Sequence, residues 1–189
     1  MGYGTDAQGS RQTISLLSGL MTFAPAPEVD NSTNENSNIK NIHLEWGKYL
    51  DPNSVIVIAY RIGQDDETSL VKYQATTVSS RLFLFNGGVN HYSEGLNTIV
   101  TYDFVFALYV EYGGGLGRFL HDKVKLAGHL EKTATFLAPS VGAGCYFHIG
   151  AGLILDINIR AEYALGISGS VDGFTSLNSF ALFGVKIAR

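Results

Sequence analysis

The chain has 189 residues, of which 46% are hydrophobic and only 16% charged, and its net charge at pH 7 is −4. This length suits a single domain, and the charged fraction lies below the roughly 25% of an ordinary soluble domain. The acidic balance without a basic stripe argues against nucleic acid as a partner, and because no apolar run of about 18 residues exists, a membrane span would have to consist of strands.

Alternation of apolar and polar residues predicts eight strands. In chain order they are Gln12 to Phe23, Ile39 to Leu50, Val55 to Gly63, Leu70 to Phe85, Val100 to Gly117, Thr133 to Phe147, Ala151 to Gly166 and Phe180 to Arg189. The alternation of the fourth strand is interrupted around Val78 to Arg81, which predicts a bulge or a misplaced strand boundary there. Pro139, inside the sixth, must occupy a bulge or an unpaired position. Long polar loops are predicted at Ala24 to Ser37, Arg118 to Lys132 and Ile167 to Asn178.

The seventh predicted strand shows the pattern most clearly. One face carries Leu155, Ile157 and Ile159, and the other carries Asp156, Arg160 and Glu162. Side chains alternate across a strand, so one side is continuously apolar and the other carries opposite charges. This division is typical of a strand that separates lipid from the polar interior of a barrel.

Eight sequential strands predict an all-β fold, an eight-stranded antiparallel up-and-down transmembrane β-barrel formed by residues 1–189 as a single domain. A closed barrel has no exposed edge and leaves no backbone group unpaired in lipid. Long connections after strands one, five and seven would be extracellular and the tight turns periplasmic, which places both termini in the periplasm. Two connections fit this rule poorly, since Gln64 to Ser69 is short and Asn86 to Asn97 is long.

The faces turned away from lipid predict a charge network in the lumen. Its members are His43, Glu45, Arg61, Glu111, Asp156, Asn158, Arg160, Glu162 and Lys186. The interior of an eight-stranded barrel is just wide enough for its own side chains, so we expect a plugged lumen instead of an aqueous pore. A structural role for these charges is favoured over catalysis, because buried ion pairs need no reaction to explain them.

Aromatic residues near the predicted strand ends suggest girdles at the two membrane interfaces. They are Trp46, Tyr49, Tyr60, Tyr112, Phe119, Phe147 and Tyr163. The single cysteine, Cys145, excludes an internal disulfide, and the scattered histidines predict no metal and no cofactor. Met1 to Gln12 lacks the pattern of a secretory signal, so an exported protein would be represented here in its mature form.

Three segments carry a resemblance to a known family. Tyr109 to Gly117, Val141 to Phe147 and Leu155 to Tyr163 look like the second half of the small bacterial outer-membrane barrels related to OmpA and OmpX. The resemblance covers about half of the chain. It implies a bacterial outer-membrane location, insertion by the barrel-assembly machinery, and contact with outer-membrane lipid, including lipopolysaccharide. The chain departs from the family at its end, where Lys186 to Arg189 replaces the usual final aromatic residue.

A shorter resemblance concerns enzymatic activity. His91-Tyr92-Ser93 looks like the His-x-Ser element of the lipid A 3-O-deacylases of the PagL type, in which Ser93 would be the nucleophile, His91 its base, and Glu94 or Glu111 the orienting carboxylate. Glu94 replaces the family's asparagine after the serine, and the motif lies in the middle of the chain. The predicted topology also places it on the periplasmic side. We therefore interpret His91 and Ser93 as polar turn residues.

These observations favour a non-enzymatic outer-membrane scaffold that presents its loops to an unknown surface partner, in adhesion, partner binding or envelope integrity. Two alternatives stay open. One is the deacylase-like enzyme. The other is a soluble lipocalin-like barrel, in which the apolar faces would point inward around a ligand.

Overall fold

A computed structural model of the chain describes residues 12–25, 37–51, 53–65, 71–85, 90–94, 97–101, 106–123, 130–150, 153–169 and 175–188. Its strands are β1 (Gln12–Pro25), β2 (Ser37–Asp51), β3 (Ser54–Asp65), β4 (Val71–Phe85), β5 (Asn90–Glu94), β6 (Asn97–Thr101), β7 (Phe106–Lys123), β8 (Leu130–Leu137), β9 (Ser140–Gly150), β10 (Leu153–Gly169) and β11 (Thr175–Ala188). Among these residues, no helix is long and apolar enough to span a membrane.

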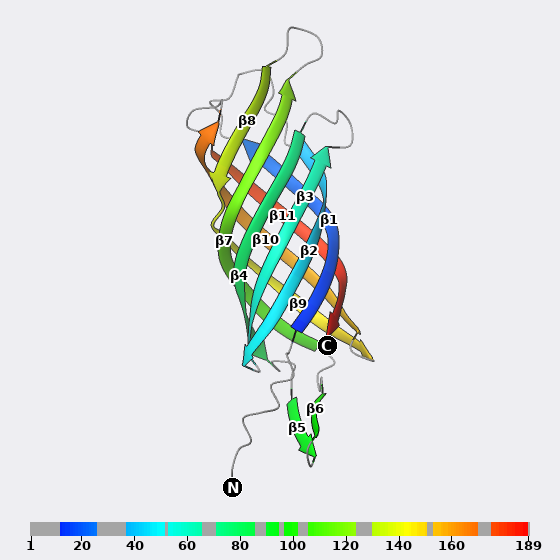
Figure 1. The fold of residues 1–189 in the computed structure, drawn as a ribbon. Helices are drawn as coiled ribbons and strands as arrows, with labels where there is room; N and C mark the ends of the chain where they lie inside the picture. The colour runs from blue at the N-terminus through cyan, green and yellow to red at the C-terminus, as the bar shows by residue number, and fades with distance from the viewer. Residues whose placement is uncertain are drawn as a thin grey trace.

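Nine of the strands close into a barrel, because β11 pairs antiparallel with both β1 and β10 (Figure 1). β8 and β9 share one position in the wall, since each of them pairs with both β7 and β10. The wall therefore has eight positions, and the predicted eight-stranded antiparallel barrel is confirmed. The strands are staggered around the barrel. Following paired residues from strand to strand once around the wall, starting at Thr13 of β1, leads back to β1 at Phe23 instead of Thr13. Such a stagger goes with the tilt that a closed barrel requires.

The predicted sixth strand is broken into β8 and β9 at Ala138 and Pro139. Proline has no backbone N–H to donate to a neighbouring strand, which accounts for the interruption. Ala138 still donates from its backbone nitrogen to the carbonyl oxygen of Gly115 at 2.9 Å, and Pro139 accepts from the nitrogen of Tyr163 at 3.0 Å. The wall thus remains joined on both sides of the break.

Two predicted loops are shorter than expected, because strands occupy much of them. β7 continues to Lys123 and β8 begins at Leu130, so strand residues fill both ends of the segment from Arg118 to Lys132. β10 likewise extends to Gly169, and β11 begins at Thr175. The alternation rule ends a strand where its outward side chains become polar, whereas these strands continue past that point. The segments 26–36, 124–129 and 170–174 lie outside the described residues.

Neither the bulge nor the misplaced boundary predicted around Val78 to Arg81 is found. β4 pairs with β3 without interruption through this region, and its register shift against β7 lies between Phe83 and Phe85. Ser79 and Arg81 are buried inside the barrel, while Ser80 lies on the outer face between apolar residues. One outward serine therefore interrupted the apolar pattern without changing the strand.

The segment Asn86 to Asn97 is not a simple link. It contains β5 and the first residue of β6, which pair only with each other in a separate hairpin. Figure 1 shows this hairpin beyond the end of the barrel at which β1 begins and β11 ends, which we call the terminal end. The barrel strand that follows begins at Phe106 instead of Val100.

The outer wall of the barrel is apolar. One residue from each wall position illustrates the surface that we call the apolar belt, and its exposure is between 42% and 63% in every case: Leu16, Leu44, Ile58, Val78, Leu116, Val141, Ile159 and Phe183. Asp156, Arg160 and Glu162 are buried inside. The lipocalin-like alternative, which requires the apolar faces to point inward, is therefore wrong for this fold.

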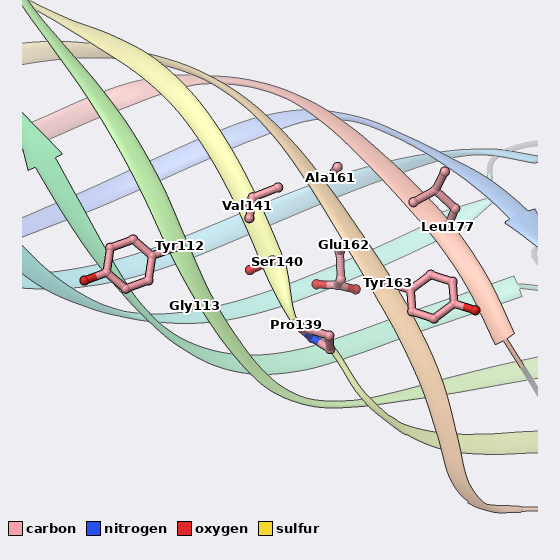
Figure 2. Close-up of a pocket in the computed structure, with 9 residues that line it drawn as sticks. All are labelled: Tyr112, Gly113, Pro139, Ser140, Val141, Ala161, Glu162, Tyr163 and Leu177. Carbon is pink, nitrogen blue, oxygen red and sulfur yellow. The ribbon is translucent and has the colours of Figure 1, made fainter. Parts of the chain in front are cut away.

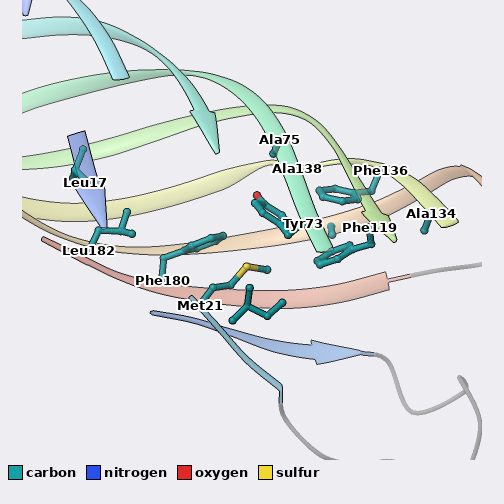
Figure 3. Packing of buried hydrophobic residues seen from close by; sticks show 12 residues of the cluster. Leu17, Met21, Tyr73, Ala75, Phe119, Ala134, Phe136, Ala138, Phe180 and Leu182 are labelled. Carbon is teal, nitrogen blue, oxygen red and sulfur yellow. The ribbon is translucent and has the colours of Figure 1, made fainter. Parts of the chain in front are cut away.

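Inside the barrel, two apolar clusters lie above and below a polar middle. One cluster, at the far end opposite the terminal end, includes Tyr73, Phe119 and Phe136 (Figure 3). The other, at the terminal end, includes Tyr49 and Phe83, whose rings stack with centroids 6.1 Å apart. Tyr49 and Phe119 are thus interior residues and not members of the predicted outer girdles.

Glycines inside the wall make room for the large interior side chains. A Cβ atom at Gly144 would clash with the backbone carbonyl oxygen of Ile157 and with the hydroxyl oxygen of Tyr109, which donates to Asp156 Oδ1 at 2.7 Å. We therefore expect Gly144→Ala to lower the free energy of unfolding by about 1–3 kcal/mol, because Tyr109 must move away from this bond and the neighbouring backbone of β10 must shift.

Urea titration of the refolded protein in detergent measures this change. Gly114→Ala is the matched control, because its Cβ would come no closer than 3.3 Å to another residue, at the carbonyl oxygen of Ala138, and it should change stability much less. Equal losses in both variants would contradict the assignment.

Candidate functional site

The barrel interior holds an ionic network centred on Arg81 of β4. Arg81 donates from Nη2 to Glu45 Oε2 at 2.7 Å and from Nε to Glu111 Oε2 at 2.8 Å. Its Nη1 donates to Asp156 Oδ2 at 3.1 Å and to the hydroxyl of Tyr146 at 2.8 Å. All these groups are buried, so one guanidinium neutralises carboxylates that come from three other strands.

Two further cations complete what we call the central cluster, which consists of Glu45, Arg81, Glu111, Asp156, Arg160 and Lys186. Arg160 Nη2 pairs with Glu111 Oε1 and lies 3.7 Å from Glu45 Oε1. Lys186 Nζ lies 3.8 Å from Asp156 Oδ2. Each carboxylate of the cluster therefore has two cationic neighbours, which offsets the cost of removing it from water.

Neutral side chains add hydrogen bonds to the carboxylate of Glu111. Ser79 Oγ donates to Glu111 Oε1 at 2.7 Å, and Asn158 Nδ2 reaches both the Tyr109 hydroxyl at 2.9 Å and Glu111 Oε2 at 3.3 Å. The ring of Tyr109 also lies 4.9 Å below the guanidinium of Arg81. These contacts fix the geometry of the charged groups and leave them little freedom for acid–base chemistry.

A separate ion pair lies nearer the far end. Arg61 Nη1 donates to Glu162 Oε2 at 2.8 Å, and Glu162 Oε1 accepts from the Tyr73 hydroxyl and from Asn178 Nδ2, both at 3.1 Å. The guanidinium of Arg61 lies 5.5 Å from the ring centroid of Phe180. This carboxylate is therefore fully engaged by groups from three other strands.

His43 is buried inside the barrel but takes no part in an ion pair among the described residues. Its ring packs edge-on against Phe180, with the centroids 5.7 Å apart. The buried charges balance without it. Within the described part of the chain they are four cations, Arg61, Arg81, Arg160 and Lys186, and four carboxylates, Glu45, Glu111, Asp156 and Glu162.

Sequence reasoning missed Arg81, the residue with the most ionic contacts in the network. Continuing the alternation of β4 strictly from Tyr73 would have placed Arg81 on the inner face, directly opposite Glu111 in the register with β7. The outward Ser80 concealed this signal. Tyr109 and Tyr146 were also missed as hydrogen-bonding residues, because their apolar rings do not reveal that their hydroxyls lie among charges.

A pocket of about 480 Å³ lies in the wall beside the break between β8 and β9 (Figure 2). Its lining consists of Tyr112, Gly113, Pro139, Ser140, Val141, Ala161, Glu162, Tyr163 and Leu177. Its exposed members Tyr112, Val141, Tyr163 and Leu177 belong to the outer face. The pocket is therefore an apolar depression in the outer wall, and Glu162 at its back is already bound to Arg61.

Of the residues considered for the deacylase-like site, Glu111 is the one whose side chain the structure describes. His91, Ser93 and Glu94 belong to β5 in the separate hairpin, and their side chains lie outside the described residues. Glu111 is buried in the barrel and bound to Arg81. No group of three potential metal ligands occurs among the described side chains.

Solved structures of small outer-membrane barrels resemble this chain. Neisserial surface protein A is 11% identical with a TM-score of 0.66, and the match covers 94% of this chain and 97% of that one. The N-terminal β-barrel domain of OprF from Pseudomonas aeruginosa is 12% identical with a TM-score of 0.54, covering 95% and 99%. No protein-family model and no curated protein matches the chain.

At these identities the similarity establishes the fold alone. The chain has the fold of the small bacterial outer-membrane barrels, as the resemblance to OmpA and OmpX predicted. Together with the outward apolar belt, this fold indicates the outer membrane as the location.

Proposed function

We propose that the protein is an integral outer-membrane protein whose single barrel domain, residues 1–189, is a rigid scaffold for surface loops. The observation that carries this proposal is the direction of the side chains. The apolar belt faces outward all around the wall, while every carboxylate whose side chain the structure describes is buried inside. Such a surface is unstable in water and suits a bilayer.

The lumen of this scaffold is proposed to be plugged. The central cluster crosses the middle of the barrel, and the two apolar clusters pack on either side of it. Because the buried charges balance, the interior needs no additional ion to be neutral. Its role is to stabilise the wall, which supports a non-enzymatic function for the barrel.

The proposed orientation places the terminal end in the periplasm and the far end outside the cell. The segments 26–36, 66–70, 124–129 and 170–174 connect strands at the far end, and a surface partner would bind there. Outer-membrane lipid, including lipopolysaccharide, would surround the belt, and the barrel-assembly machinery would insert the chain. Adhesion and envelope integrity are both compatible with this arrangement.

Fluorescence of the only tryptophan tests membrane insertion. Trp46 lies on the outer face of β2, and its Nε1 donates to Gln12 Oε1 at 3.2 Å. In bilayers of brominated phospholipid its emission should fall by at least half, because bromine atoms would contact the ring. A protein that stays in solution would show no such quenching.

A matched variant separates insertion from loose adsorption. Trp46→Phe combined with Tyr49→Trp moves the tryptophan from the outer face to the interior of the same strand, since Tyr49 is buried. Its emission should resist the brominated lipids. Equal quenching at positions 46 and 49 would reject the proposed direction of the side chains.

A further inference from the structure

His43 is a buried titratable side chain that takes part in neither of the ion-pair groups described above. It lies on the inner face of β2 and is inaccessible to solvent. Neither Nδ1 nor Nε2 of its ring has a hydrogen-bond partner among the described residues. Buried polar groups are normally hydrogen-bonded, so this exception calls for an explanation.

The charged residue directly beside His43 is a cation. His43 lies opposite Arg61 in the register of β2 with β3, and opposite Leu17 in the register of β1 with β2. The guanidinium of Arg61 lies 5.5 Å from the ring centroid of Phe180, and the His43 ring packs edge-on against the same phenylalanine. Like charges directly opposite each other destabilise a strand pair. A positive charge on His43 would therefore be repelled by Arg61.

The buried carboxylates around the lumen already have cationic partners. Glu45, two residues from His43 on the same face of β2, is bound to Arg81 and lies 3.7 Å from Arg160. The described charges that face the lumen are Glu45 on β2, Arg61 on β3, Arg81 on β4, Glu111 on β7, Asp156, Arg160 and Glu162 on β10, and Lys186 on β11, and the buried phenols among them are Tyr49, Tyr73, Tyr109 and Tyr146. β1 contributes no ionisable residue. A proton on His43 would thus add a positive charge without a carboxylate to balance it.

Phe180 connects His43 to the far-end apolar cluster. Its ring also contacts Tyr73, with the centroids 6.0 Å apart. Tyr73 in turn packs against Phe119 and Phe136 (Figure 3). A displacement of Phe180 would therefore disturb the packing that closes this end of the lumen.

We propose that His43 makes the plug acid-sensitive, and that a proton on its ring loosens the far-end apolar cluster. Histidine is the side chain whose charge in water changes between about pH 5 and 8. While His43 is neutral, the described buried charges balance and its ring packs on Phe180. Once it is charged, repulsion from Arg61 displaces the ring and releases Phe180. The inference rests on the proposed plugged lumen.

Urea titration of the refolded protein in detergent tests the role of His43. Between about pH 7.5 and about pH 5.5 the ratio of unfolded to folded wild-type protein should rise about tenfold, because a histidine kept neutral in the fold gains a proton once exposed, near its ordinary pKa of about 6.5. His43→Gln and His43→Phe cannot take up this proton and should lose the difference. His43→Phe also keeps a ring against Phe180. His148→Gln is the matched control, since it removes a half-buried histidine near the terminal end and should keep the difference.

Tryptophan reporters locate the loosened region. Phe119→Trp and Tyr49→Trp, each combined with Trp46→Phe, place one tryptophan in the far-end cluster or in the cluster at the terminal end. On acidification over the same range, acrylamide quenching at position 119 should about double, because a locally opened region admits the quencher. Quenching at position 49 should stay constant. Adding His43→Gln should abolish the change at position 119.

The proposal fails if both His43 variants keep the wild-type dependence on pH, if His148→Gln loses it equally, or if the tryptophans at the two ends respond alike. Any of these results would leave the membrane scaffold intact, because brominated lipid tests that proposal separately. Equal quenching by brominated lipid at positions 46 and 49 would instead overturn the scaffold itself.

Discussion

Replacing Arg81 by methionine should lower the free energy of unfolding by about 3–5 kcal/mol. The guanidinium of Arg81 contacts Glu45, Glu111 and Asp156, and all three carboxylates are buried. Without it, negative charges would remain close together in a space that excludes water. Methionine fills a similar volume, so the loss reports the uncompensated charge more than a cavity.

Urea titration, followed by the gel shift between the folded and heat-denatured barrel, measures this loss. Arg118→Met is the control on the neighbouring strand β7, where the arginine is exposed, and it should change stability little. Adding Glu111→Gln to Arg81→Met should recover part of the loss, because one excess negative charge is removed. If Arg81→Met were as stable as the wild type, the central cluster would have no structural role.

Introducing arginine at Ile159 should destabilise the protein in bilayers by about 2–4 kcal/mol. Ile159 lies in the middle of β10 and is 63% exposed on the outer wall. On a soluble barrel an arginine at so exposed a position would be tolerated. In a bilayer its charge would lie in the hydrocarbon core. The loss of stability therefore distinguishes a membrane barrel from a soluble one.

The position of the substitution along the wall provides the control. Ile149 is exposed to almost the same extent, at 62%, but it lies at the end of β9. Ile149→Arg should therefore cost only about 0–1 kcal/mol, since it would lie near the membrane interface. Refolding into phospholipid vesicles over a range of urea concentrations measures both variants. Equal costs at positions 149 and 159 would argue against a spanning wall.

Strict alternation made most of the wall predictable from the sequence. In β10 every outward and inward residue from Leu155 to Tyr163 lies on the expected face, because the period of a strand is two residues. The prediction failed where an outward residue is polar. Ser80 suggested a bulge that does not exist, and the polar ends of β7 and β10 were mistaken for loops.

The contacts within the network were less predictable than its location. The alternation of residues along each strand placed most of the charged side chains inside. Their ion-pair partners, however, are determined by how distant strands face one another across the lumen. Arg61 and Glu162, which are 101 residues apart in the chain, form a hydrogen bond that no local pattern could indicate. The position of His43 beside Phe180, without an ion pair to any described residue, likewise depends on packing and not on residue type.

The pairing of β1 with β11 has a consequence for biogenesis. These strands come from opposite ends of the chain, and their register runs from Thr13 with Ala188 to Pro25 with Ser176. Until the final segment has been synthesised and delivered, β1 and β10 would each expose a row of unsatisfied amide and carbonyl groups. The ring must therefore form late, from a complete polypeptide, and contacts of such long sequence separation make that step slow and dependent on protection from aggregation.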